Sequence, residues 1–132
     1  MKKTIISIGT AIYKLLSEDT DILKLIKNKS AIYPLVSPLD TKFPFLVYSR
    51  NSNDYNSNKD YRMDNASISI SCVSDRYEEA VELAELVREK LKVINTEING
   101  IFINKIKLDN TNEYYANDAY VQELTFNCIV TI

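Results

Sequence analysis

The stretch NASISISCVSDRYEEAVELAELVREKLKVI, residues 65–94, carries the two most regular patterns in the chain. In its first part, apolar side chains alternate with Ser67, Ser69 and Ser71, which is typical of a strand with one buried face and one solvated face. In the remainder, apolar residues recur at helical spacing, and they are Ala80, Leu83, Ala84, Val87, Leu91 and Ile94. Asp75 and Glu78 resemble a capping box. The sequence therefore predicts a helix over about 75–94 that packs on one face of a β layer.

The segments on either side supply further elements. Residues 3–17 have apolar positions close to helical spacing, and Asp19 is placed to cap a second short helix. Three prolines predict an extended connector over 31–43. Strands are predicted in three other segments, which are 45–48, 101–108 and about 121–132.

The order of these elements is helices, hairpin, helix, hairpin, which predicts an α+β domain. We expect a mainly antiparallel sheet of about four or five strands, with the N-terminal helices and the one long helix packed on one face. No internal repeat or linker divides the sequence, so residues 1–132 are predicted to form a single domain.

Two polar tracts, residues 51–60 and 109–118, are predicted to be loops that project from the ends of the sheet. Tyrosines interrupt both tracts, and arginines flank the first. Because tyrosine offers a large contact area at low entropic cost and arginine bonds carboxylates, these residues are candidates for a subunit or partner interface. The candidates are Arg50, Tyr55, Tyr61, Arg62, Tyr114 and Tyr115. The alternative is a pair of mobile loops whose tyrosines face solvent.

An acidic row runs along the outer side of the predicted long helix and consists of Glu78, Glu82, Glu85 and Glu89. Glu85 and Glu89 are like charges one turn apart, which is slightly unfavourable in isolation. The row is either a solvated face or an acidic surface that lines a passage for DNA, where repulsion from phosphate would prevent sticking.

The composition excludes much of the usual catalytic and metal-binding chemistry. The 132 residues include no His and only two Gly, so the sequence has no imidazole base, no imidazole metal ligand and no glycine-rich phosphate loop. The formal net charge of −2 differs from the dense positive charge of nucleic-acid-binding domains. No segment approaches the roughly 20 apolar residues that cross a bilayer. We therefore expect a protein that binds or assembles and does not catalyse a reaction, with no metal and no membrane partner.

Cys72 and Cys128 each lie on the apolar side of a predicted strand. Buried free thiols are the simpler interpretation. A disulfide between neighbouring strands is the alternative, which an exported chain would allow.

Several short motifs occur in a fixed order along the chain. They are Ile32-Tyr33-Pro34, Pro38, Phe43-Pro44-Phe45-Leu46-Val47-Tyr48, Ile68 to Cys72, Tyr77-Glu78-Glu79-Ala80, and Leu83-Ala84 through Val87-Arg88 to Leu91. Together they resemble the small tail-completion, or head–tail joining, proteins of long-tailed bacteriophages and prophages, which are related in fold to tail terminators. The motifs are structural, so they carry over as markers of the fold and not as functional residues.

The resemblance implies a non-enzymatic connector without a cofactor, which forms a ring, often a hexamer. The implied partners are other copies of the chain, the tail-tube protein and the head-side connector protein, with DNA only as passing cargo. The implied location is the head–tail junction of the virion, and the host cytoplasm during assembly. The alternative function is that of a monomeric, non-enzymatic adaptor that binds a peptide or a small ligand.

Overall fold

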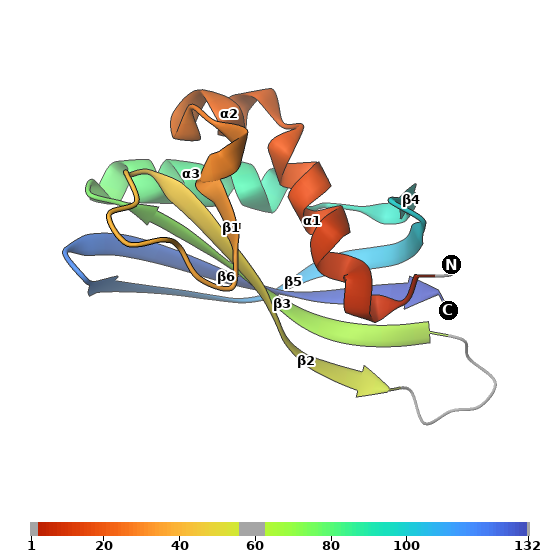
Figure 1. The fold of residues 1–132 in the computed structure, drawn as a ribbon. Coiled ribbons are helices and arrows are strands. Elements are labelled where there is room, and N and C mark those ends of the chain that lie inside the picture. Colours follow the sequence, from red (N-terminus) through yellow and green to blue (C-terminus); the bar gives the residue numbers. More distant parts are fainter. Residues whose placement is uncertain (1–2, 56–62, 132) are drawn as a thin grey trace.

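The computed structural model describes residues 3–55 and 63–131, with side chains at all of these positions except 52–55. A layer of helices covers one face of a sheet (Figure 1). The strands are β1 (Ile32–Pro34), β2 (Phe45–Tyr55), β3 (Met63–Ser74), β4 (Ile94–Ile98), β5 (Ile101–Ala116) and β6 (Ala119–Thr131). Within the described residues they form one sheet in the order β1-β2-β3-β6-β5-β4, in which β1 is parallel to β2 and all other pairs are antiparallel. The mainly antiparallel α+β architecture is confirmed, but six strands replace the expected four or five.

The helices α1 (Ile8–Ser17), α2 (Thr20–Ile26) and α3 (Tyr77–Lys90) lie on the same side of this sheet, and short 3-10 turns precede α1 and β1 (Figure 1). Asp19 caps α2 as predicted, because its carboxylate accepts a hydrogen bond from the backbone N–H of Ile22 at 2.9 Å. One core joins the helices to the inner face of the sheet, and its buried members include Ile8, Ile12, Leu16, Ile68, Ile70, Leu83, Val87, Leu124, Phe126 and Val130. None of the helices in the described part of the chain is long and apolar enough to cross a membrane.

The start of α3 differs from the predicted capping box. Arg76 is its N-cap residue, and no side chain caps the helix from that position. The chain turns at Ser74 instead, whose hydroxyl accepts a hydrogen bond from the backbone N–H of Arg76 at 3.1 Å. The expected pairing of Asp75 with Glu78 is therefore wrong, because Ser74 at the end of β3 satisfies the local backbone first.

The end of α3 also comes before the predicted limit at residue 94. The carbonyl of Val93 accepts a hydrogen bond from the backbone N–H of Ile106 at 3.0 Å, which ties the chain to β5 soon after the helix. Ile94 consequently begins β4 and is 65% exposed, although its spacing in the sequence placed it on the buried side of the helix.

The polar tracts form strands where loops were predicted. β5 continues through the second tract as far as Ala116, and β2 enters the first tract as far as Tyr55. Asn117 and Asp118 have φ values of 53° and 60°, as a two-residue hairpin turn requires. Polar residues hold a strand conformation here because β6 pairs with β5 along its full length down to Ala119 and satisfies the backbone groups.

The face of the sheet that turns away from the helices is the open face. Its centre is polar, since Ser67, Ser69 and Ser71 of β3 lie on it as the alternation predicted. At one end it carries a small apolar cluster that consists of Phe45, Val73, Ala119 and Val121. The connector predicted over 31–43 is extended at its start, where it forms β1 and pairs with residues 46–48 of β2.

Cys72 in β3 and Cys128 in β6 are buried free thiols, which confirms the simpler prediction. The register pairs Cys72 with Gln122 and Cys128 with Ala66, so the sulfur atoms are separated by several residues along the strands. This separation is too large for the disulfide that was the alternative.

Candidate functional site

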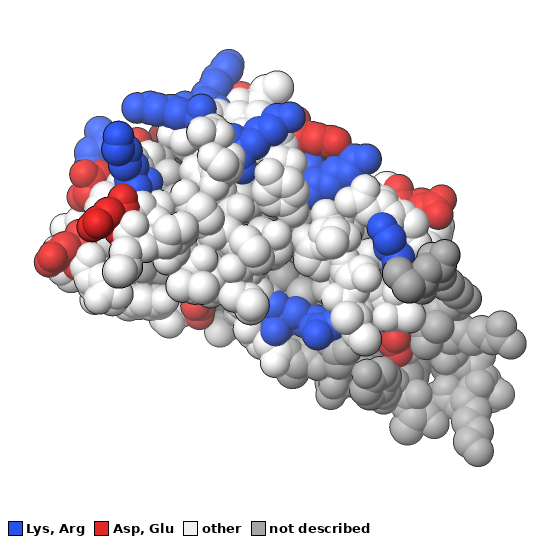
Figure 2. Space-filling model, in the orientation of Figure 1, with Lys and Arg blue, Asp and Glu red and all other residues white. Residues whose placement is uncertain are grey.

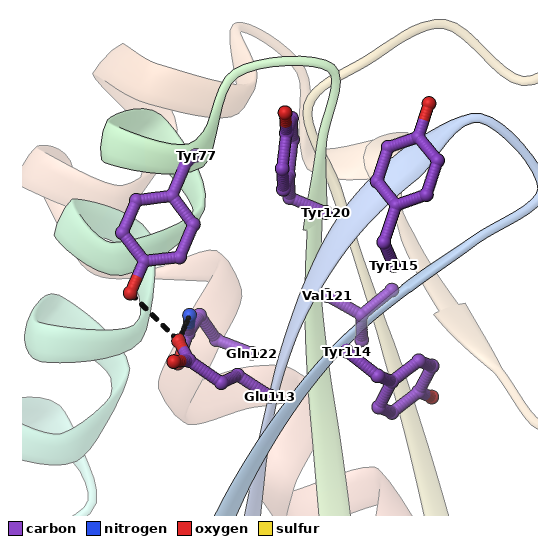
Figure 3. Close-up of a pocket in the computed structure, with 7 residues that line it drawn as sticks. All are labelled: Tyr77, Glu113, Tyr114, Tyr115, Tyr120, Val121 and Gln122. Carbon is purple, nitrogen blue, oxygen red and sulfur yellow. Dashed lines mark hydrogen bonds between the residues drawn. The ribbon is translucent and has the colours of Figure 1, made fainter.

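The β5–β6 hairpin carries aromatic and polar side chains on both faces near its turn. Three pairs of these residues are cross-strand neighbours, namely Glu113 with Gln122, Tyr115 with Tyr120, and Tyr114 with Val121. The first two pairs lie on the helix-bearing side of the sheet, where Tyr77 at the start of α3 joins them (Figure 3). These seven residues form the aromatic end of the molecule and line a hollow of about 230 Å³.

Glu113 is the polar centre of the aromatic end. One of its carboxylate oxygens accepts hydrogen bonds from the amide of Gln122 at 2.6 Å and from the hydroxyl of Tyr77 at 2.7 Å (Figure 3). These bonds, first that from Gln122 and then that from Tyr77, lower the pKa of Glu113. The same carboxylate raises the pKa of Tyr77. Glu113 is thus held ionised, and the ring of Tyr77 is held in place over the hairpin.

The rings pack edge to face and still expose much of their area. The ring centroids of Tyr77 and Tyr120 are 5.8 Å apart, and those of Tyr115 and Tyr120 are 4.9 Å apart. Tyr77 is 47% exposed and Tyr115 is 59% exposed. Edge-to-face packing fixes the orientation of the rings in advance, so a partner can bury them at little further entropic cost.

A groove on the open face continues this surface. Its volume is about 340 Å³, and its lining includes Phe43, Phe45 and Val73. Leu35 and Val36 border it and are 74% and 72% exposed. Tyr114 and Val121 line both this groove and the hollow of the aromatic end, so aromatic or apolar side chains lie on both faces at one end of the sheet.

This surface is suited to contact more than to catalysis. An exposed carboxylate whose pKa is lowered is a weak general base. No group of three or more side chains in the described part of the chain is arranged to hold a metal ion. Exposed tyrosines around a fixed polar group are instead the residue types that protein interfaces use.

The structure separates the predicted interface residues. Tyr114 and Tyr115 lie in the aromatic end, on opposite faces of β5. Arg50 lies on β2, where its guanidinium donates to the carbonyl of Ile5 at 3.4 Å, far along the sheet from the hairpin turn. Tyr61 and Arg62 lie outside the described residues, as does the side chain of Tyr55. The six candidates therefore do not form one described cluster.

The predicted acidic row lies on α3, and its four members, Glu78, Glu82, Glu85 and Glu89, are all exposed. Acidic side chains gather where α3 begins, and lysines gather around α2 (Figure 2). Glu89 forms an ion pair with Lys92 at 2.8 Å, and both side chains are solvated. The exposure agrees with either reading of the row and does not choose between them.

Five of the seven members of the aromatic end were not among the predicted interface residues, and they are Tyr77, Glu113, Tyr120, Val121 and Gln122. The signal for the hairpin members was present, because strand pairing about the Asn117-Asp118 turn sets Glu113 opposite Gln122 and Tyr115 opposite Tyr120. Because residues 109–118 were predicted to be a loop, this strand pairing was not considered. Tyr77 joins the hairpin only through the packing of α3, which no local pattern reveals.

Residues 10–132 match the family model described as Tail completion protein gp17, so the chain belongs to that family. This is a family of phage structural proteins, and membership confirms the resemblance seen in the motifs. It supports a structural role and not an enzymatic one.

Solved structures share the fold. A chain from "Virion of native gene transfer agent (GTA) particle" is similar with a TM-score of 0.74 and 18% identity, over 98% of this chain and 100% of that one. A second solved chain, whose name describes no function, has a TM-score of 0.63 and 11% identity over 95% of this chain and 94% of its own. No curated protein sequence matches the chain.

Proposed function

We propose that the chain completes the phage tail as a ring of identical copies, which binds the end of the tail tube and joins it to the head-side connector. The family match carries this proposal, because it spans residues 10–132 and thus nearly the whole fold. The similarity in fold to a chain of a gene transfer agent virion supports it, since that chain is likewise part of a virion particle. In this role the chain is a virion component at the head–tail junction.

The aromatic end supplies the contact surface that this role needs. Tyr115 and Tyr77 expose about half of their area, and the groove beside Tyr114 is lined mostly by apolar side chains. A partner that covered this end would bury apolar area on both faces of the hairpin at once. This geometry favours an interface over solvent-facing tyrosines.

Negative-stain electron microscopy of the purified chain mixed with purified tail tubes tests the proposal. A ring at one end of each tube supports it. If the chain associates with no part of the tail, the proposal is wrong and the monomeric adaptor for a peptide or small ligand is favoured, with the groove of about 340 Å³ as its site.

Removing one exposed ring tests the surface itself. We expect Tyr115→Ser to lower the fraction of occupied tube ends by about tenfold or more, as truncation of an interfacial aromatic does. Ile94→Ser is the matched control, since Ile94 is 65% exposed but lies on β4, away from the hairpin turn. Equal occupancy for both variants would show that the aromatic end is not the contact surface.

The acidic row is proposed to face DNA as it passes through the ring. Its exposure on α3 supports this role, and a solvated face is the alternative. The double variant Glu82→Lys with Glu85→Lys is expected to form rings on tubes but to deliver DNA poorly, because the added lysines attract phosphate. Normal infectivity of phage that carries this variant would leave the row as a solvated face.

A further inference from the structure

Two strands lack a neighbour over part of their length within the described residues. β1 covers β2 only as far as Tyr48, so residues 49–55 of β2 form one free edge. On the other side of the sheet, β4 and the adjoining Val93 cover β5 only as far as Ile106, so residues 107–116 form a second free edge (Figure 1). A free edge presents backbone N–H and C=O groups that a further strand can bond.

These edges carry little of the protection that natural edge strands use. Neither free edge contains Pro, and Lys107, at the very start of the second edge, is the one Lys in either of them. Bulges interrupt β2 between Arg50 and Ser52 and β5 between Leu108 and Asn110, but both lie near the beginning of the free segments. Regular strand follows each bulge.

The side chains of the two edges are complementary on both faces of the sheet. On the helix-bearing side, β2 carries Arg50 and β5 carries Glu113, which have opposite charges. On the open face both edges carry small or amide side chains, namely Ser49, Asn51, Asn110 and Asn112, and the larger Tyr114 follows on β5. Strands that pair keep their two faces distinct, so acid would meet base on one face and amides would meet amides and hydroxyls on the other.

The directions of the strands suit a closed ring. β2 and β5 run in opposite directions, because each neighbouring pair between them is antiparallel. A rotation that carries one copy onto the next therefore brings β2 beside β5 in antiparallel orientation. Because the two edges are different surfaces, the contact is head-to-tail and repeats until the ring closes.

The offset between the two edges also fits closure. Within one copy, Asn112 pairs with Glu123, Glu123 with Ser71, and Ser71 with Val47, so Asn112 and Val47 lie at the same height along the strands. If Asn112 lies beside Asn51 of the next copy, each copy is displaced from its neighbour by about 13 Å along the strand direction. The displacement across the strands is about 19 Å. This shift tilts the strands by roughly 35°, at the lower limit of the roughly 35–45° that closed sheets adopt.

We infer that the free edge of β5 in one copy pairs with the free edge of β2 in the next copy, so that one continuous sheet runs around the ring. The inference rests on the proposed ring and names the surfaces by which its copies meet.

Disulfide cross-linking tests this pairing. A chain with Asn51→Cys and Asn112→Cys is assembled on tail tubes, oxidised and separated on a non-reducing gel, and cysteines at Asn110 and Tyr114 replace the one at Asn112 to scan the register. We expect covalent multimers up to the closed ring for at least one of these pairs. Each single-cysteine variant is expected to remain monomeric, since a head-to-tail contact never brings the same position of two copies together. Thr96→Cys on β4, combined with Asn51→Cys, is the matched negative control.

Each other outcome has a definite meaning. Rings on the tubes without cross-links from any pair would overturn the inference and leave the proposed function intact. Dimers from Asn112→Cys alone would also overturn it, because they require a twofold contact between two β5 edges. Multimers from the double variant without rings on tubes would support the edge pairing and contradict the proposed function. Neither rings nor cross-links would overturn both.

Discussion

Cys72 and Cys128 show how burial controls the chemistry of a single residue. Burial raises the pKa of both thiols, that of Cys128 to about 12, so both are neutral near pH 8. Because the thiolate is the reactive form, we expect neither cysteine of the folded chain to react with a colorimetric disulfide reagent at pH 8. Both should react at once in concentrated urea. Reaction of either thiol in the folded chain would show that its strand opens readily.

The same shift predicts lower stability at alkaline pH. The folded-state pKa of Cys128 lies above the value of about 8.5 in an unfolded chain, so folding favours the protonated thiol. Its contribution is complete below about pH 8.5 and is lost as the pH rises toward 12. Between pH 9 and 10, we expect the free energy of unfolding to fall more steeply in the native chain than in Cys128→Ala, by about 1 kcal/mol per pH unit. Urea titrations at both pH values measure this difference, and parallel slopes would contradict it.

Single residues of the contact surface were only partly predictable. Tyr114 and Tyr115 stand out in the sequence because large aromatic side chains are unexpected in a polar tract. Glu113 does not stand out, since its role depends on a hydrogen bond from Tyr77, which lies 36 residues away. Contacts between such distant residues are set by the packing of α3 on the sheet and leave no local pattern.

Among the elements, α3 was predictable and the second half of β5 was not. The buried side of α3 repeats at helical spacing, and burial of that side forms much of the core. Residues 109–116 have no apolar alternation, and they are strand because β6 pairs with them. Pairing energy between strands overrode the local preference for a loop.

The element α1 offers a direct test of helix propensity. Gly9 lies in its first turn, and an added Cβ would meet the ring of Tyr48 at 3.4 Å, an ordinary contact. We expect Gly9→Ala to raise the free energy of unfolding by about 0.5–1 kcal/mol, because alanine loses less backbone entropy in a helix. Chemical denaturation measures the change.

Gly100→Ala is the matched control for this prediction. Gly100 has a φ of +80° in the turn between β4 and β5, where a side chain is strained. We expect this variant to lose about 1–2 kcal/mol. A loss for Gly9→Ala as well would show that the ring of Tyr48 cannot accommodate the added methyl group.

For the whole molecule, the two shortest strands explain why six strands exceed the expected number. β1 has three residues and β4 has five, and neither is long enough to show an alternating pattern. Each becomes a strand only because a longer neighbour, β2 or β5, accepts it at an edge. These short strands also stop early, and so they leave uncovered the segments of β2 and β5 that we infer to meet in the ring.

The pairing of these edges makes a charge-reversal prediction for the assembly. Arg50→Glu would place a carboxylate beside Glu113 of the next copy, so we expect the occupancy of tube ends to fall by about tenfold or more. Glu113→Arg alone should also lower the occupancy of tube ends, because two guanidinium groups would then meet. Combining both changes inverts the pair and should restore occupancy, which electron microscopy of the tubes measures.

The comparison between the single and the double variant separates assembly from folding. Glu113→Arg also removes the hydrogen bonds from Tyr77 and Gln122, but that loss is common to the single and the double variant. Arg50→Glu likewise removes the bond to the carbonyl of Ile5 in both variants that carry it. The single variants place like charges at the contact between copies, and the double variant places opposite charges there. Recovery of occupancy in the double variant must therefore come from that contact. If the double variant occupies as few tube ends as either single variant, Arg50 and Glu113 do not meet between adjacent copies.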